Sequence, residues 1–134
     1  MDNKKILIVD DDPDIRLGMN VRLKANHYDP FFAGDAASAL IEAEKQQPDL
    51  VLLDLGLPGD DGFVVMERFK QIPLIADIPI IVVSARDARA AQARAIEAGA
   101  KAFLRKPFDD VELLALIRAT TGEPALSEKA SLHN

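Results

Sequence analysis

The chain has 134 residues, a formal net charge of -6 and no cysteine. This length is typical of one domain that buries a single substantial core. The lack of cysteine excludes disulfides, thiolate metal sites and cysteine nucleophiles, and it fits a reducing compartment. Because nonspecific nucleic-acid binding needs a basic surface, the acidic charge argues against direct contact with nucleic acid.

The sequence shows no membrane-spanning pattern. It has no run of about 18 apolar residues, and the polar residues 1–5 lead directly into a strand pattern. We therefore expect a soluble protein of the cytoplasm that makes no membrane contact.

Short apolar runs rich in β-branched residues recur along the chain. They lack polar alternation, which is typical of strands buried on both faces of a parallel sheet. The expected strands are residues 5–9, 30–33, 50–53, 79–83 and 102–104.

Helical stretches with recognisable start and stop signals lie between and after these strands. The first is expected to begin with Asp12 as N-cap and Pro13 at the first helical position, and the fourth to end at Gly99 in a left-handed C-cap. The expected helices are residues 13–26, 35–46, 63–71, 88–98 and 109–121, and a short polar tail follows. Strands that alternate with helices predict right-handed crossovers and one parallel sheet covered on both faces.

Polar side chains follow four of the expected strands, at the end where each strand stops. Asp10 and Asp11 follow the first strand, Asp54 the third, Ser84 the fourth and Lys106 the fifth. Since the carboxyl ends of parallel strands meet at one edge of the sheet, these groups are predicted to lie together. Gathered carboxylates need a compensating cation, and oxygen ligands suit a hard divalent ion such as Mg2+.

Asp54 is the candidate nucleophile, because a carboxylate can accept a phosphoryl group to form a mixed anhydride. Purely structural roles for these acidic residues remain as alternatives to this chemical one. Asp54 could close a turn, and the acids at 10–12 could cap the following helix or be solvated. Ser84 and Lys106 are weak signals when each is taken alone. Pro107 raises the chance of a cis peptide bond after Lys106.

Six segments together resemble the receiver domain of two-component response regulators. They are ILIVDDDPDI at 6–15, DLVLLD at 49–54, LPGDDG at 57–62, IIVVSA at 80–85, GA at 99–100 and KPF at 106–108. Each segment is a weak signal, but their order and spacing are specific. The resemblance implies a flavodoxin-like (βα)5 fold, a doubly wound parallel sheet of strand order 2-1-3-4-5, over a receiver domain at 4–122 with a short polar tail at 123–134.

The resemblance also implies roles for individual residues. Asp54 would accept a phosphoryl group from a sensor histidine kinase or a histidine phosphotransfer protein. Asp10, Asp11, Asp54 and the backbone carbonyl of Gly56 would bind Mg2+. The remaining roles belong to the pair Ser84 and Lys106, which would hold the phosphoryl oxygens, and to Phe103, which would be the switch aromatic.

In the family, bonds that exist only in the phosphorylated state shift the population toward a different surface on the fourth helix, fifth strand and fifth helix. The chain would then be a phosphoacceptor switch and not an enzyme, with self-catalysed phosphorylation and dephosphorylation only. Its output partner or output domain is not identified by the sequence. It could be a monomer or a phosphorylation-dependent dimer, and it could stand alone or come from a larger protein.

Three features depart from a common pattern of the family. Gly56 stands where many members carry a larger side chain, which leaves the water path to the phosphoryl group more open or differently shaped. Arg86 places a cation near the mouth of the site or is a solvated loop charge. Lys101 and Ala102 replace an acidic pair that is frequent in transcription-factor receivers, which puts their mode of dimerisation in doubt.

Ile15 has two interpretations. It begins a helical stripe with Met19 and Leu23, which is ordinarily core packing. Because it also follows the acidic cluster, it could instead lie exposed beside the site and dock a phosphodonor helix.

Three other functions fit less well. A phosphatase or phosphotransferase of the haloacid dehalogenase kind needs a second aspartate at the position of Gly56. A flavodoxin needs hydroxyls and glycines after the first strand and aromatic rings for the flavin, whereas this chain has three aspartates there, one Tyr and no Trp. A receiver that binds partners without phosphorylation ranks below the phosphorylated switch.

Overall fold

The structure is a computed structural model that describes residues 3–56, 62–85 and 88–122. Strands and helices alternate along it: β1 Lys4–Val9, α1 Pro13–Ala25, β2 Tyr28–Ala33, α2 Ala36–Gln46, β3 Leu50–Asp54, α3 Gly62–Gln71, β4 Ile80–Ser84, α4 Ala88–Glu97, β5 Ala102–Arg105 and α5 Asp110–Thr121. Residues 57–61, Arg86 and the tail at 123–134, to which some of the sequence interpretations refer, lie outside the described residues.

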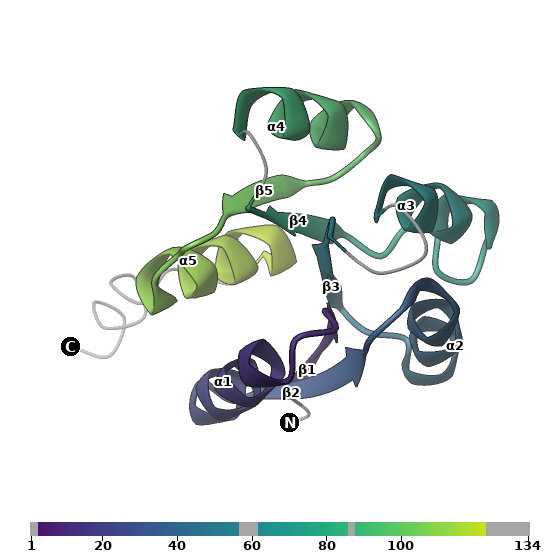
Figure 1. The fold of residues 1–134 in the computed structure, drawn as a ribbon. Helices are drawn as coiled ribbons and strands as arrows, with labels where there is room; N and C mark the ends of the chain where they lie inside the picture. The colour runs from purple at the N-terminus through teal and green to yellow at the C-terminus, as the bar shows by residue number, and fades with distance from the viewer. Residues whose placement is uncertain (1–2, 57–61, 86–87, 123–134) are drawn as a thin grey trace.

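All neighbouring strands pair in parallel, in the order β2-β1-β3-β4-β5. This is the order that the resemblance implied, so the predicted fold class is confirmed. Helices α1 and α5 cover one face of the sheet, and α2, α3 and α4 cover the other (Figure 1). β3 is the central strand and β1 lies beside it, so the carboxyl ends of both strands open near the middle of one edge of the sheet.

Both faces of the sheet are apolar, as expected for a parallel sheet between two helix layers. In β1, Leu7 and Val9 pack toward α2 and α3, whereas Ile6 and Ile8 pack toward α1 and α5. This alternation follows from the period of two residues in a strand. Two separate apolar clusters thus hold the sheet rigidly from both sides.

All five strands include residues beyond those expected, and among them β1 begins at Lys4 and β3 ends at Asp54. β2 begins at Tyr28, ahead of Pro30, and this is possible because β2 pairs only with β1 and an edge strand tolerates a proline. β4 includes Ser84, and β5 includes Arg105. The predicted helix signals are confirmed for Asp12, which caps α1, and for Gly99, whose φ is 107°. Among the described helices, none is both long enough and apolar enough to cross a membrane.

Candidate functional site

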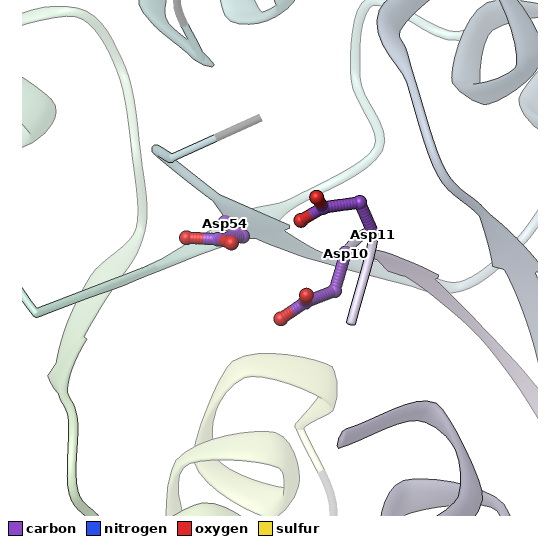
Figure 2. A group of neighbouring side chains, drawn as sticks. All are labelled: Asp10, Asp11 and Asp54. Atoms are coloured by element: carbon purple, nitrogen blue, oxygen red, sulfur yellow. The ribbon is translucent and has the colours of Figure 1, made fainter. Parts of the chain in front are cut away.

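Three carboxylates meet at the carboxyl edge of the central strands. Asp10 and Asp11 directly follow β1, and Asp54 is the last residue of β3. One oxygen of each carboxylate lies within 4.8 Å of the others. Figure 2 shows Asp10 and Asp11 side by side on one segment, with Asp54 across from them. The register explains this meeting, because Val9 at the end of β1 pairs with Leu53.

The adjacent acids differ in their surroundings. Asp10 is 4% exposed, whereas Asp11 is exposed to solvent. Asp12 turns to the helix, since its carboxylate accepts a hydrogen bond from the backbone N–H of Asp14 at 2.9 Å. The backbone N–H of Asp12 in turn donates to Asp10 Oδ1 at 2.9 Å. Asp12 therefore serves as the cap and leaves the other two acids for the site.

Lys106 brings one positive charge to the three carboxylates. Its Nζ atom lies 3.2 Å from Asp10 Oδ2 and 3.6 Å from Asp54 Oδ2. The peptide bond that joins it to Pro107 is cis, as the sequence indicated. One ammonium leaves an excess of two negative charges among hard oxygen ligands, and this donor set fits a divalent cation such as Mg2+.

Ser84 closes β4, which pairs with β3, and is buried. Its backbone carbonyl accepts a hydrogen bond from the N–H of Lys106 at 2.9 Å, while the N–H of Leu55 donates to the carbonyl of Val83 at 3.1 Å. These bonds tie the ends of β3, β4 and β5 together. Phe103 on β5 is half-buried and packs against the apolar cluster on the side of α4.

Gly56 makes a tight turn after Asp54. Its backbone N–H donates to Asp54 Oδ1 at 3.0 Å. A Cβ atom at position 56 would lie 3.5 Å from the same oxygen, which is an ordinary contact. With glycine here, no side chain at this position shields the carboxylate of Asp54.

Two hollows that the described residues form adjoin the acidic cluster. The cavity beneath Asp10, Asp54 and Lys106 has a volume of about 10 Å3. Beside it lies an apolar hollow of about 460 Å3, lined in part by Ile15 and Phe108. Ile15 is half-buried and packs against the core, and it also lines this hollow, so the docking of a phosphodonor helix against it stays a prediction.

Sequence analysis missed two residues at this edge. Arg16 on α1 donates from Nε to the backbone carbonyl oxygen of Asp10 at 2.6 Å. Its guanidinium occupies the space next to Gly34, where a Cβ atom would overlap Arg16 Nη2. The signal that was available is the position of Gly34, which follows β2 and therefore lies at the same sheet edge as the acids.

The model of the response regulator receiver domain family matches residues 6–118. The chain belongs to this family. PleD of Caulobacter vibrioides is 40% identical over 118 residues, which are 87% of this chain and 26% of PleD. The transcriptional regulator RpaA of Synechocystis is 36% identical over 130 residues, which are 97% of this chain and 54% of RpaA. This receiver domain thus spans about half or less of the length of these curated relatives.

Solved receiver domains have the same fold. A CheY-like receiver domain protein from Methanospirillum hungatei is 28% identical with a TM-score of 0.82, and the match covers 90% of this chain and 94% of that one. The receiver domain of the sensor histidine kinase PA1611 from Pseudomonas aeruginosa is 26% identical with a TM-score of 0.82, and the match covers 90% of this chain and 99% of that one. That structure contains a magnesium ion coordinated in its active-site cleft.

Proposed function

We propose that this receiver domain accepts a phosphoryl group on Asp54 from a sensor histidine kinase or a histidine phosphotransfer protein and that it needs Mg2+ to do so. The observation that carries the proposal is the meeting of Asp10, Asp11 and Asp54 with the ammonium of Lys106 at one edge of the sheet. The family membership supports it. The domain would cover residues 4–122, and a cytoplasmic location is part of the same proposal.

In the proposed transfer, an Asp54 carboxylate oxygen forms the new bond to phosphorus. The bond between phosphorus and the donor's imidazole nitrogen breaks, and its electron pair stays on the nitrogen. Mg2+ bound by Asp10, Asp11, Asp54 and the carbonyl of Gly56 would supply positive charge to the oxygens of the transferring group. No further co-reactant is required.

Lys106 would act before and after the transfer. In the structure its ammonium pairs with carboxylates of Asp10 and Asp54. A phosphoryl group on Asp54 carries more negative charge than the carboxylate it replaces, so it would compete for the ammonium as a point-charge partner. The hydroxyl of Ser84 would bind a second phosphoryl oxygen from the end of the neighbouring strand.

The new bonds would favour one conformation of the output surface, formed by α4, β5 and α5. Phe103 belongs to β5 and packs against the apolar cluster on the side of α4, and it would change its packing as Ser84 moves. Exposed Lys101 and Arg105 give the β5 part of this surface a basic character, so its partner or its dimer contacts would differ from those of receivers with an acidic pair here.

The apolar hollow beside the site supports docking of a phosphodonor. It lies next to Lys106, and Ile15 is available in its wall. An apolar contact in this hollow beside Lys106 would hold a donor helix while its histidine reaches the carboxylate of Asp54. The partner would be a protein and not a nucleic acid or a membrane.

Intact-mass spectrometry after incubation with acetyl phosphate tests the proposal. The wild-type chain should gain one phosphoryl group in the presence of Mg2+ and none when the metal is chelated, and Asp54→Asn should gain none. Asp49→Asn is a matched control, since Asp49 precedes the same strand at its opposite end and accepts a hydrogen bond from the N–H of Lys5. A folded wild-type protein that never gains mass would instead indicate a receiver that binds partners without phosphorylation.

A further inference from the structure

Four hydrogen bonds hold the backbone and the carboxylate of Asp10 in place. Its N–H donates to the carbonyl of Ala33 at 3.0 Å, and its Oδ1 accepts from the N–H of Asp12 at 2.9 Å. Its Oδ2 accepts from Lys106 Nζ at 3.2 Å. The fourth bond, from Arg16 Nε to the backbone oxygen at 2.6 Å, involves a side chain that has no part in the proposed transfer.

The bond from Arg16 acts on the peptide unit that joins Asp10 to Asp11. A peptide unit is planar, so fixing its oxygen fixes the plane in which the N–H of the next residue lies. The directions in which Asp10 and Asp11 leave the backbone both depend on that plane. Arg16 therefore constrains two of the three carboxylates through one hydrogen bond.

Gly34 makes room for this arrangement. A Cβ atom there would overlap Arg16 Nη2 and lie 3.4 Å from Arg16 Cζ. Gly34 is not among the described glycines with positive φ, which are Gly99 and Gly122, so its backbone would accept an alanine. The cost of a side chain at 34 is therefore the displacement of the guanidinium and not backbone strain.

We propose that Arg16, given room by Gly34, is a positioning residue that sets the geometry of Asp10 and Asp11 and thereby the affinity of the site for Mg2+. This inference rests on the proposed function, because it assumes that the carboxylates bind a divalent cation. Residues that orient metal ligands from outside the ligand set commonly change metal affinity by about 10- to 100-fold when they are replaced.

The charge of Arg16 makes it possible to distinguish positioning from electrostatics by the direction in which Mg2+ affinity changes. A guanidinium near a cation site repels the cation, so its removal would strengthen Mg2+ binding if charge alone mattered. Asp35 balances part of this charge: hydrogen bonds from the backbone and hydroxyl of Ser38 lower the pKa of the Asp35 carboxyl, and Arg16 lowers it further. Positioning and charge thus predict opposite effects of the same substitution.

Isothermal titration calorimetry with Mg2+ on four variants tests the proposal. Gly34→Ala keeps the charge of Arg16 but displaces it, and Arg16→Gln removes the charge together with the bond. Both should weaken Mg2+ binding about 10-fold or more. The double variant should bind no more weakly than Arg16→Gln alone, because Gly34 acts only through Arg16.

Gly18→Ala is the matched control for the added methyl group. A Cβ at position 18 would meet Arg22 atoms at 3.8 Å and beyond, which is ordinary contact, and Mg2+ affinity should stay at the wild-type value. Thermal unfolding without Mg2+ shows which variants are folded, and Arg16→Gln adds no bulk, so it keeps the test available if Gly34→Ala does not fold.

Each outcome is decisive. A folded Gly34→Ala with wild-type affinity, a tighter Mg2+ complex in Arg16→Gln, or additive losses in the double variant would overturn the positioning role and leave the proposed function intact. A wild-type chain that binds no Mg2+ would overturn both.

Discussion

The Nζ atom of Lys106 lies 3.2 Å from Asp10 Oδ2, although 96 positions separate the two residues in the chain. Neither residue is placed by its local sequence alone. The parallel sheet brings the carboxyl end of β1, which lies next to the central strand, and the carboxyl end of β5, an edge strand, to the same side, and the ion pair forms there. The ammonium is therefore the electrostatic counterpart of an acidic cluster that the first half of the chain supplies.

Replacement of Lys106 by methionine should destabilise the protein in the absence of divalent cations. The substitution leaves Asp10, which is almost fully buried, without its charged donor, and a hydrogen bond to a charged group contributes about 1.5–3 kcal/mol. Urea unfolding in the presence of a chelator measures the loss. Added Mg2+ should stabilise Lys106→Met more than it stabilises the wild type, because the competing ammonium is gone.

Lys101→Met is the control for Lys106→Met, because Lys101 is an exposed lysine that precedes β5. Its unfolding midpoint should match that of the wild type. Equal midpoints for both variants would mean that the Lys106 ion pair contributes nothing to the folded state.

Replacement of Asp11 by asparagine should slightly raise the thermal unfolding midpoint without Mg2+. It removes one of three mutually repelling carboxylates at nearly constant shape, and because Asp11 is exposed the gain should be below about 1 kcal/mol. With Mg2+ present the order should reverse, since the variant has lost a ligand and gains less from the cation. Differential scanning calorimetry with and without Mg2+ shows whether the curves cross, and parallel curves would contradict a metal role for Asp11.

Replacement of Gly62 by alanine should destabilise the fold by about 1–3 kcal/mol, the usual effect of overpacking. A Cβ at the start of α3 would lie 2.8 Å from Leu55 Cδ2 and 2.9 Å from Leu55 Cα, so the helix must move from the end of β3. Gly56→Ala is the comparison, because its nearest contact would be 3.5 Å from Asp54 Oδ1. Chemical denaturation should separate the two variants clearly, and similar midpoints would show that α3 can shift freely.

Replacement of Asp35 by asparagine should reduce the dependence of stability on pH in the acidic range. Ser38 holds the folded-state pKa of Asp35 below its ordinary value, so this carboxylate stabilises the fold above the pKa of the unfolded chain, and the contribution is lost as the pH falls through the folded pKa. Asparagine caps a helix about as well as aspartate, so capping of α2 is preserved. The difference in unfolding free energy between the two proteins should shrink from pH about 6 to about 3.

Ser38→Ala provides a second measure of the same effect. It removes the hydroxyl donor and keeps the backbone donor, so its pH dependence should lie between those of wild type and Asp35→Asn. A constant difference across the pH range in both variants would contradict the hydrogen-bonded arrangement of Asp35.

The gathering of Asp10, Asp54 and Lys106 could be predicted from local strand and helix signals combined with the rule that parallel strands end at one edge, whereas the strand order came from the resemblance to receiver domains. Apolar runs mark the strands, caps such as Asp12 mark the helices, and a parallel sheet fixes which strand ends share an edge. The roles of these residues stay predictions, and so do those of Ser84 and Phe103.

Contacts that depend on side-chain direction could not be predicted in the same way. The bond from Arg16 to Asp10 depends on the orientation of α1 about its own axis and on the lack of a side chain at Gly34. An amphipathic pattern shows neither of these. The position of Ile15 was hard to predict for the same reason, because one helical side chain can pack on the core and line a surface hollow at once. The early start of β2 at Tyr28 was missed because Pro30 weakens a strand signal everywhere except at an edge.

The cavity of about 10 Å3 beneath the acidic cluster has room for about one water molecule and none for a phosphoryl group. A group attached to Asp54 would therefore project outward from the sheet, and the donor and the water that hydrolyses the bond would approach through one entrance. The duration of a signal would then depend on whichever molecule covers that entrance, because the cavity that the described residues form beneath Asp54 is too small to enclose the modification.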